Sequence, residues 1–196
     1  MDGLFSSEGE AFAHMYQDVR RLQRLVDDLQ DLSRVEAGQI HLQVQTFDLV
    51  SLIERIVGQV LPQANAESLN LYTDFRTDQL QVYADPDRTV QVLVNLLSNA
   101  IRYTPEGGQI RVVVDHHDQF ALVSVIDTGV GISNEDLKQI FERFFRVDAS
   151  RTRRSGGSGI GLTIAQHLTW AMGGELSAAS DGTGHGSTFR FTLPLA

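Results

Sequence analysis

The sequence predicts an α+β protein, a two-layer sandwich in which helices cover one face of a mixed sheet, preceded by one long amphipathic helix. Segments with the alternating apolar pattern of strands are intermixed with segments of helical periodicity, without the strict strand–helix alternation of an all-parallel sheet. A narrow leucine seam occupies the first part of the chain, and the pattern changes after Gly38. We therefore expect a helical segment in residues 1–39 and a globular domain in residues 40–196.

The first helix is predicted over residues 16–37, after a loop over residues 1–13. Its leucines recur at alternating spacings of three and four and leave the other face polar, as in the seam of a coiled coil; they are Leu22, Leu25, Leu29 and Leu32. So narrow a stripe suits a coiled-coil or bundle partner better than a globular core.

The globular part is predicted to begin with a strand, because Ile40, Leu42 and Val44 alternate with polar residues. The Gly-, Ser- and Arg-rich stretch 148–159 has no apolar period and is predicted to be a mobile loop. Further strands are expected at 69–75, 81–83, 109–115, 120–126, 175–179 and 188–193, and helices at 49–67, 86–102, 134–145 and 160–172.

The composition is that of an ordinary globular protein, with 42% hydrophobic and 21% charged residues. The absence of cysteine excludes disulfides and cysteine-ligated zinc. A net charge of -9 argues against nucleic-acid binding. No apolar run approaches the roughly 20 residues of a membrane span, and the start lacks a signal-peptide layout, so we expect a soluble chain without membrane contact.

One polar helix face is a candidate metal and phosphate site. Asp85 and Pro86 open the helix, and Asn95, Asn99 and Arg102 share one of its faces. Carboxamide oxygens suit a hard cation such as Mg²⁺, and Arg suits phosphate, although this helix taken alone favours the interpretation of a merely solvated outer face. The apolar residues expected to face the core are Val90, Leu93, Val94, Leu97 and Ile101.

Three glycine-rich segments are further candidates. Asp127 follows an apolar strand and precedes Gly129 and Gly131, where a carboxylate could accept a hydrogen bond from an amine such as that of adenine. Glycines at 156–161 lead into a helix, whose N-terminus favours anions, and glycines at 182–186 lead into a strand. Each segment alone could be an ordinary turn.

The apolar residues of the expected helix 134–145 lie on one helical face, and we favour core packing for them over a docking surface. They are Leu137, Ile140, Phe141, Phe144 and Phe145.

Taken in order, these segments resemble the characteristic boxes of bacterial sensor histidine kinases. The matching motifs are Asn-x-x-x-Asn-Ala-x-Arg at 95–102, Asp-x-Gly-x-Gly-Ile at 127–132, Ile-Phe-Glu-Arg-Phe-Phe-Arg at 140–146, Gly-x-Gly-Ile-Gly-Leu at 157–162 and Gly-x-Gly-Ser-Thr-Phe at 184–189. Residues 25–38 resemble the second helix of the dimerisation hairpin of that family.

The resemblance implies a Bergerat-type fold that binds ATP and Mg²⁺. It implies that Asn99 is the principal metal ligand, with Asn95 one turn away near metal and phosphate. Arg102 would then contact phosphate, where the family usually has Lys, and Tyr103 would lie against the nucleotide.

The same resemblance implies roles for the glycine-rich segments. Asp127 would read the adenine amine, and Thr188 would support that end of the site. The residues implied to shape the adenine wall are Gly129, Gly131 and Ile132, and those implied to lend backbone to the phosphates are Gly157, Gly159, Ile160, Gly161 and Leu162.

The phosphate-accepting histidine of the family is expected on a hairpin helix absent from this chain. None of the six histidines has its sequence context; they are His14, His41, His116, His117, His167 and His185. We therefore expect that the chain alone cannot phosphorylate itself. The partners implied are ATP or ADP, a histidine-bearing hairpin, a response regulator and, in the full-length parent, a second copy. The implied location is cytoplasmic, with membrane anchoring of the parent left open.

Three alternatives stand beside the kinase. A hydrolysing ATPase of the gyrase or chaperone kind carries a Glu one turn before the metal-binding Asn, whereas this chain has Asn95, which cannot act as a base. A serine kinase of the anti-sigma type is disfavoured by residues 25–38 and by the Phe-rich segment. A non-enzymatic dimerisation or scaffold module would leave the site empty.

Overall fold

The computed structural model describes residues 41–146 and 158–196, together with single positions nearer the N-terminus. Those positions are all helical, within and just before the helix expected over 16–37, whereas Leu25, Leu32 and Gly38 lie outside the described residues. So does most of the loop expected at 148–159. The single positions are Phe12, Met15, Tyr16, Val19, Leu22, Gln23, Val26, Leu29, Gln30, Ser33 and Arg34.

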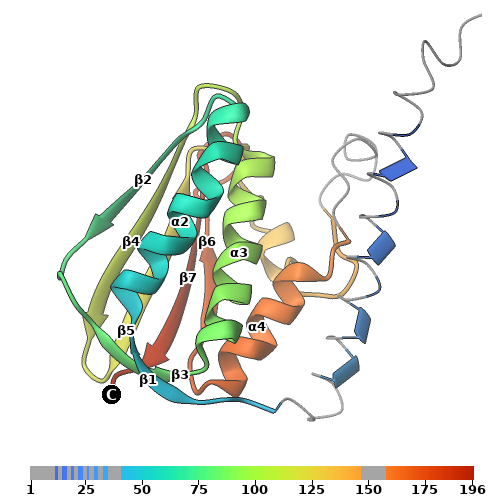
Figure 1. Ribbon diagram of the computed structural model, residues 1–196. Helices are drawn as coiled ribbons and strands as arrows, with labels where there is room; N and C mark the ends of the chain where they lie inside the picture. Colours follow the sequence, from blue (N-terminus) through green and yellow to red (C-terminus); the bar gives the residue numbers. More distant parts are fainter. Residues whose placement is uncertain are drawn as a thin grey trace, which may run out of the picture.

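A five-stranded mixed sheet with helices on one face forms the domain, as Figure 1 shows. The strand order is β2-β4-β5-β7-β6, in which β2 and β4 pair in parallel and the other neighbours are antiparallel. The predicted α+β class is therefore confirmed. The strands are β2 (Asn70–Phe75), β4 (Gln109–His117), β5 (Phe120–Asp127), β6 (Leu176–Ala179) and β7 (Ser187–Pro194), and the covering helices are α2 (Leu49–Ala66), α3 (Pro86–Tyr103) and α4 (Gly161–Ala171).

A separate antiparallel ribbon pairs β1 (Gln45–Asp48) with β3 (Gln81–Ala84). The strand predicted from Ile40, Leu42 and Val44 is wrong, since residues 41–44 have no regular structure and the strand begins one residue later. At residue 43 the backbone bonds to a side chain in place of a neighbouring strand. The N–H of Gln43 donates to Asp85 Oδ2 at 2.7 Å.

The same Asp85 caps α3, as the sequence predicts. Its Oδ1 accepts from the backbone N–H groups of Asp87 and Arg88 at 3.0 and 3.1 Å, and Pro86 supplies the first helical residue. One buried carboxylate therefore holds both the chain that enters the domain and the first turn of α3.

The core lies between the helices and the sheet. In α3 the buried stripe passes through Leu93, Leu96, Leu97 and Ala100, whereas Val94, expected in the core, is exposed. At 100° per residue Val94 falls at the edge of that stripe, which explains the error. The stripe forms one core with α2 and with apolar residues of β4, β5 and β7. The largest fully buried side chains of that core include Ile53, Ile56, Leu93, Ile110, Phe191 and Leu193.

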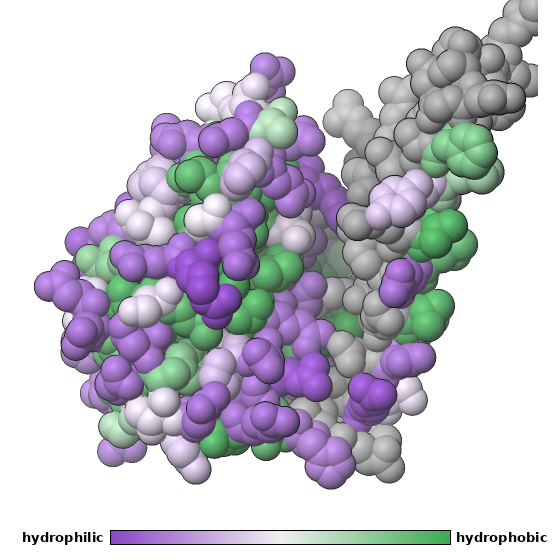
Figure 2. Space-filling model, in the orientation of Figure 1, coloured by the Kyte–Doolittle hydropathy of each residue, from purple (hydrophilic) through white to green (hydrophobic). Residues whose placement is uncertain are grey.

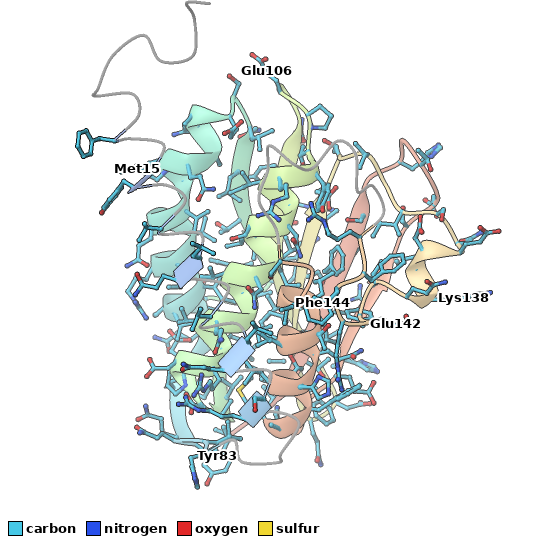
Figure 3. All side chains as sticks on the ribbon, turned by 90° about the vertical axis from the view of Figure 1, so that its right-hand side faces the viewer. Met15, Tyr83, Glu106, Lys138, Glu142 and Phe144 are labelled. Carbon is cyan, nitrogen blue, oxygen red and sulfur yellow. The ribbon has the colours of Figure 1, made fainter. Side chains whose placement is uncertain are left out.

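The helix predicted over residues 134–145 is wrong. Ser133 does cap a turn, accepting from the N–H of Asp136 at 3.1 Å, but only the 3₁₀ turn η1 (Asp136–Lys138) follows. Phe144 has φ 61°, outside the helical region, and its N–H donates to Gly159 O at 2.9 Å. This long-range bond outweighs the local periodicity. Phe144 is 60% exposed beside the start of α4, as Figure 3 shows, while Phe141 and Phe145 pack against the core.

Within the part of the chain that the structure describes, no helix has both the length and the apolar character needed to cross a bilayer.

Candidate functional site

The C-terminal half of α3 presents the three polar residues singled out from the sequence. Asn95, Asn99 and Arg102 are all partly buried on that helix. In the described part of the chain, no side-chain hydrogen bond or ion pair engages Asn99 or Arg102. A carboxamide and a guanidinium are therefore available here for a ligand.

Asn95 differs from them because it joins α3 to α4. Its Nδ2 donates to the backbone oxygen of Gly161 at 3.1 Å. A Cβ at position 161 would lie 3.3 Å from Asn95 Oδ1, so glycine allows the close approach. The hydrogen bond uses the amide nitrogen and leaves Oδ1 as an acceptor.

The start of α4 supplies backbone N–H groups on the same side of α3. Gly161 and Leu162 begin the helix, and Ile160 precedes them without a side-chain cap. Gly159 has φ 73°, and a Cβ there would lie 3.0 Å from the backbone of Phe144. The first N–H groups of a helix have no intrahelical acceptor, so this end can receive an anion. Gly157, also predicted to lend backbone, lies outside the described residues.

Asp127 ends β5 as a buried carboxylate, only 6% exposed. Its Oδ1 accepts from the N–H of Gly129 at 2.8 Å and from that of Ser187 at 3.3 Å. Its Oδ2 accepts from Ser187 Oγ at 2.5 Å. An ionised carboxylate offers about four acceptor positions, so these three bonds fix its orientation and leave capacity for one more donor.

The hydroxyl that contacts Asp127 belongs to Ser187, whereas the resemblance implied the next residue, Thr188, as support for this end of the site. In the β5–β7 ladder Ser187 pairs with Asp127, whereas Thr188 pairs with Ile126 and so belongs to the opposite face of the sheet. Sequence reasoning missed Ser187. Knowledge of the register in which the last strand pairs with β5 would have identified it, because residues directly opposite each other on paired strands share a face of the sheet.

Tyr103 brings the end of α3 against the turn that follows Asp127. Its backbone oxygen accepts from the N–H of Val130 at 3.0 Å. A Cβ on Gly129 would lie 2.5 Å from that oxygen and 2.6 Å from Asp127 Oδ1, so no other residue fits. This contact places the C-terminal end of α3 beside the buried carboxylate. Next along the turn, Gly131 has φ 70° and the N–H of Ile132 donates to Ser180 Oγ at 3.0 Å.

The structure thus brings predicted residues of three segments, namely α3, the turn after Asp127 and the start of α4, close to one another, with Ser187 added from the fourth. One end of the site is a buried acceptor, and the other combines a carboxamide, a guanidinium and the open start of α4. Such a site is complementary to a ligand with an amine at one end and a metal-bound anion at the other.

This architecture is that of a known family. The family described as "Histidine kinase-, DNA gyrase B-, and HSP90-like ATPase" matches residues 84–196, and the chain belongs to it. The predicted Bergerat-type fold and the predicted likeness to sensor histidine kinases are both confirmed.

Individual relatives are sensor kinases. The sensor histidine kinase WalK of Bacillus subtilis is 35% identical over 179 residues, which is 90% of this chain and 29% of WalK. The histidine kinase AdeS of Acinetobacter baumannii superposes with a TM-score of 0.80 at 27% identity, over 99% of this chain and 88% of that one. Full-length ShkA, solved in complex with AMPPNP, gives 0.83 at 26% identity, over 99% of this chain and 40% of that one. The chain thus spans less than half the length of WalK.

Proposed function

We propose that this chain is the catalytic part of a sensor histidine kinase, which binds Mg-ATP and positions its γ-phosphoryl group for transfer to a histidine of a separate helix. The observation that carries the proposal is the contrast between the unpartnered side chains of α3 and the oriented carboxylate at the end of β5. Asn99 and Arg102 are unengaged among the described residues, while Asp127, next to the end of the same helix, is held in a fixed orientation.

At the base end, Asp127 is proposed to accept from the exocyclic amine of adenine. The carboxylate is buried and oriented by Gly129 and Ser187, so its orientation is fixed before the base arrives. Hydrogen bonds to an ionised acceptor in such a setting are about twice as strong as those between neutral groups.

At the phosphate end, Asn99 is proposed as the principal Mg²⁺ ligand, with Asn95 Oδ1 nearby and Arg102 on a phosphate. No cluster of three or more acidic or histidine side chains suited to a metal occurs in the described part of the chain. The carboxamide oxygens of Asn99 and Asn95 fit Mg²⁺, which keeps several waters and takes few protein ligands plus substrate phosphates. A bound ion would neutralise charge on the phosphoryl group, and the N-terminus of α4 and the guanidinium of Arg102 would add fixed positive charge.

Transfer is favoured over hydrolysis by Asn95. It occupies the place where the related hydrolases carry a Glu, and its Nδ2 is bound to Gly161 O. A carboxamide cannot take a proton from water at neutral pH, so water bound here is not activated. Positioning then serves an external nucleophile, the imidazole nitrogen of the acceptor.

Residues 1–39 are proposed to be part of a dimerisation and phosphotransfer hairpin, with residues 40–196 as the catalytic domain. The described apolar positions of the first helix, which include Val19, Leu22, Val26 and Leu29, follow the three–four spacing of a seam and are exposed, as Figure 2 shows. The partners proposed with it are a second copy in the parent protein, the histidine-bearing hairpin and a cognate response regulator. The proposed location is the cytoplasm.

The deciding experiment incubates the full chain with γ-labelled ATP, Mg²⁺ and a separately produced hairpin that carries the acceptor histidine. We expect label on the hairpin, none on the chain itself, and none on a hairpin with that histidine changed to alanine. Release of inorganic phosphate without labelled hairpin would instead identify a hydrolase, and absence of both with no ATP binding would identify a non-enzymatic module.

A further inference from the structure

Two glycine-rich turns pack against each other beside Asp127. The first turn spans residues 129–132 and the second spans residues 180–186. The N–H of Gly184 donates to Val130 O at 2.7 Å, and that of Gly186 donates to Gly129 O at 3.1 Å. A Cβ on Gly131 would lie 2.1 Å from the backbone oxygen of Gly182, so the backbones themselves are in contact.

The hydroxyl of Ser180 bonds to both turns. It accepts from the N–H of Ile132 in the first turn at 3.0 Å and from that of Gly182 in the second at 3.3 Å. It donates to Gly186 O at 2.6 Å, with Gly182 O a more distant acceptor at 3.3 Å. A hydroxyl has one hydrogen and two lone pairs, so these bonds use its full capacity.

The bond to Gly186 connects Ser180 to the carboxylate. Gly186 has φ 70°, and a Cβ there would lie 2.0 Å from Asp127 O, so this residue is pressed against the end of β5. The next residue is Ser187, which holds both oxygens of the Asp127 carboxylate. Ser180 therefore fixes the end of the turn from which Asp127 receives two of its three hydrogen bonds.

We infer that Ser180 is a positioning residue for base recognition and that its hydroxyl sets the selectivity of the site for a purine with an amine, as in ATP, over one with a carbonyl oxygen, as in GTP. The inference rests on the proposed function. A carboxylate held in place repels an oxygen at the position of the amine, because two acceptors then face each other without a proton. Once Ser180 is removed, the second turn and Ser187 can shift, and the carboxylate can turn away from that oxygen.

The test compares Ser180→Ala with Ser177→Ala in the full chain. Ser177 is the matched control, since it is an exposed serine of β6 whose hydroxyl has only a long, 3.5 Å bond to Arg190 O. Dissociation constants for Mg-ATP and Mg-GTP are measured by calorimetry. We expect Ser180→Ala to weaken ATP about tenfold and to lower the ATP-over-GTP preference about fivefold, the scale of lost hydrogen bonds to a polar group, while Ser177→Ala changes neither.

Two further measurements separate positioning from a general loss of structure. Hydrogen exchange without nucleotide should accelerate at the amides of Ile132 and Gly182 in Ser180→Ala and stay unchanged in Ser177→Ala. Ser180→Thr keeps the hydroxyl and should keep the base preference.

Several outcomes would overturn the inference. One is a Ser180→Ala variant that binds both nucleotides more weakly by the same factor, and another is an equal loss of preference in Ser180→Thr. Failure of the proposed function looks different, because the unaltered chain would then bind neither nucleotide while the exchange difference at Ile132 and Gly182 persisted.

Discussion

The two ends of the site around α3 are built in opposite ways. At the base end, Asp127 is buried, and its carboxylate accepts three hydrogen bonds from Gly129 and Ser187. At the phosphate end, Asn99 and Arg102 have no side-chain partner among the described residues.

The difference shows which side chains are oriented before the ligand binds and which are oriented only by the ligand. A pre-oriented carboxylate loses little freedom on binding, so the base end can provide affinity and selectivity. The phosphate end is completed only when metal and phosphates arrive, so its residues should affect metal dependence more than folding.

The largest expected effect comes from the fixed end. Replacing Asp127 with Asn should raise the dissociation constant of Mg-ATP about 100-fold, because a charged acceptor is lost and an amide NH₂ is placed among donors. Calorimetry at equal protein concentrations measures it. Asp118→Asn makes the same charge change at an exposed hairpin position and should leave binding unchanged. Equal affinity in the Asp127 variant would remove the base-reading role.

The open end should respond through the metal. Asn99→Ala should weaken ATP about 30-fold with Mg²⁺ present and less than about twofold with a chelator, because only a metal ligand is lost. Its melting temperature should match that of the unaltered chain, since the side chain of Asn99 bonds to no other described residue. Asn134→Ala, at an exposed position, serves as control. A similar loss with and without Mg²⁺ would contradict the assignment.

Asn95 lies between the two behaviours, because it is bound to Gly161 and yet faces the open end. Asn95→Glu should raise basal ATP hydrolysis roughly tenfold, below the contribution of an evolved general base. Asn95→Gln, which has the length of Glu without its basicity, should not. Phosphate release is the measurement, and unchanged hydrolysis in a glutamate variant that still binds ATP would count against the preference for transfer.

The smallest effect is expected at Asp48, an oriented carboxylate away from the site. Partial burial raises its pKa, but hydrogen bonds from the Ser51 hydroxyl and from the backbone N–H groups of Leu80, Ser51 and Val50 outweigh burial and lower the pKa below the usual 3.8. Asp48→Asn should reduce the free energy of unfolding by about 1 kcal/mol near neutral pH, because its hydrogen bonds then go to a neutral acceptor in place of a charged one, without changing ATP affinity.

The sign of the pH dependence follows from that lowered pKa. The stabilisation by Asp48 is complete above 3.8 and is lost as the pH falls through the lower folded-state pKa. Urea unfolding should therefore show the difference between the unaltered chain and Asp48→Asn shrinking in acid. A difference that stays constant across that range would contradict the lowered pKa.

Sequence alone predicted the elements whose signals are local. The cap at Asp85, the proline after it and the apolar period of α3 are all close in sequence, and the helix formed as predicted. The strands of the five-stranded sheet were likewise placed to within two residues at either end by alternation and flanking turns.

The errors arose where distant residues decide. The Phe144 region lost its helix to a backbone bond with Gly159, and nothing near residue 144 signals that partner. Choosing between Ser187 and Thr188 requires the register of β7 on β5, and recognising Ser180 requires the contact between two turns about 50 residues apart in sequence.

The bond from Gln43 to Asp85 gives the domain a mechanical property. Residue 43, at which the chain enters the domain, is hydrogen-bonded to the same carboxylate that caps the start of α3. A force applied to the chain before residue 43 would therefore act on the N-terminus of α3. Asn99 lies on that helix about 14 residues after Asp85, or about 21 Å at 1.5 Å per residue.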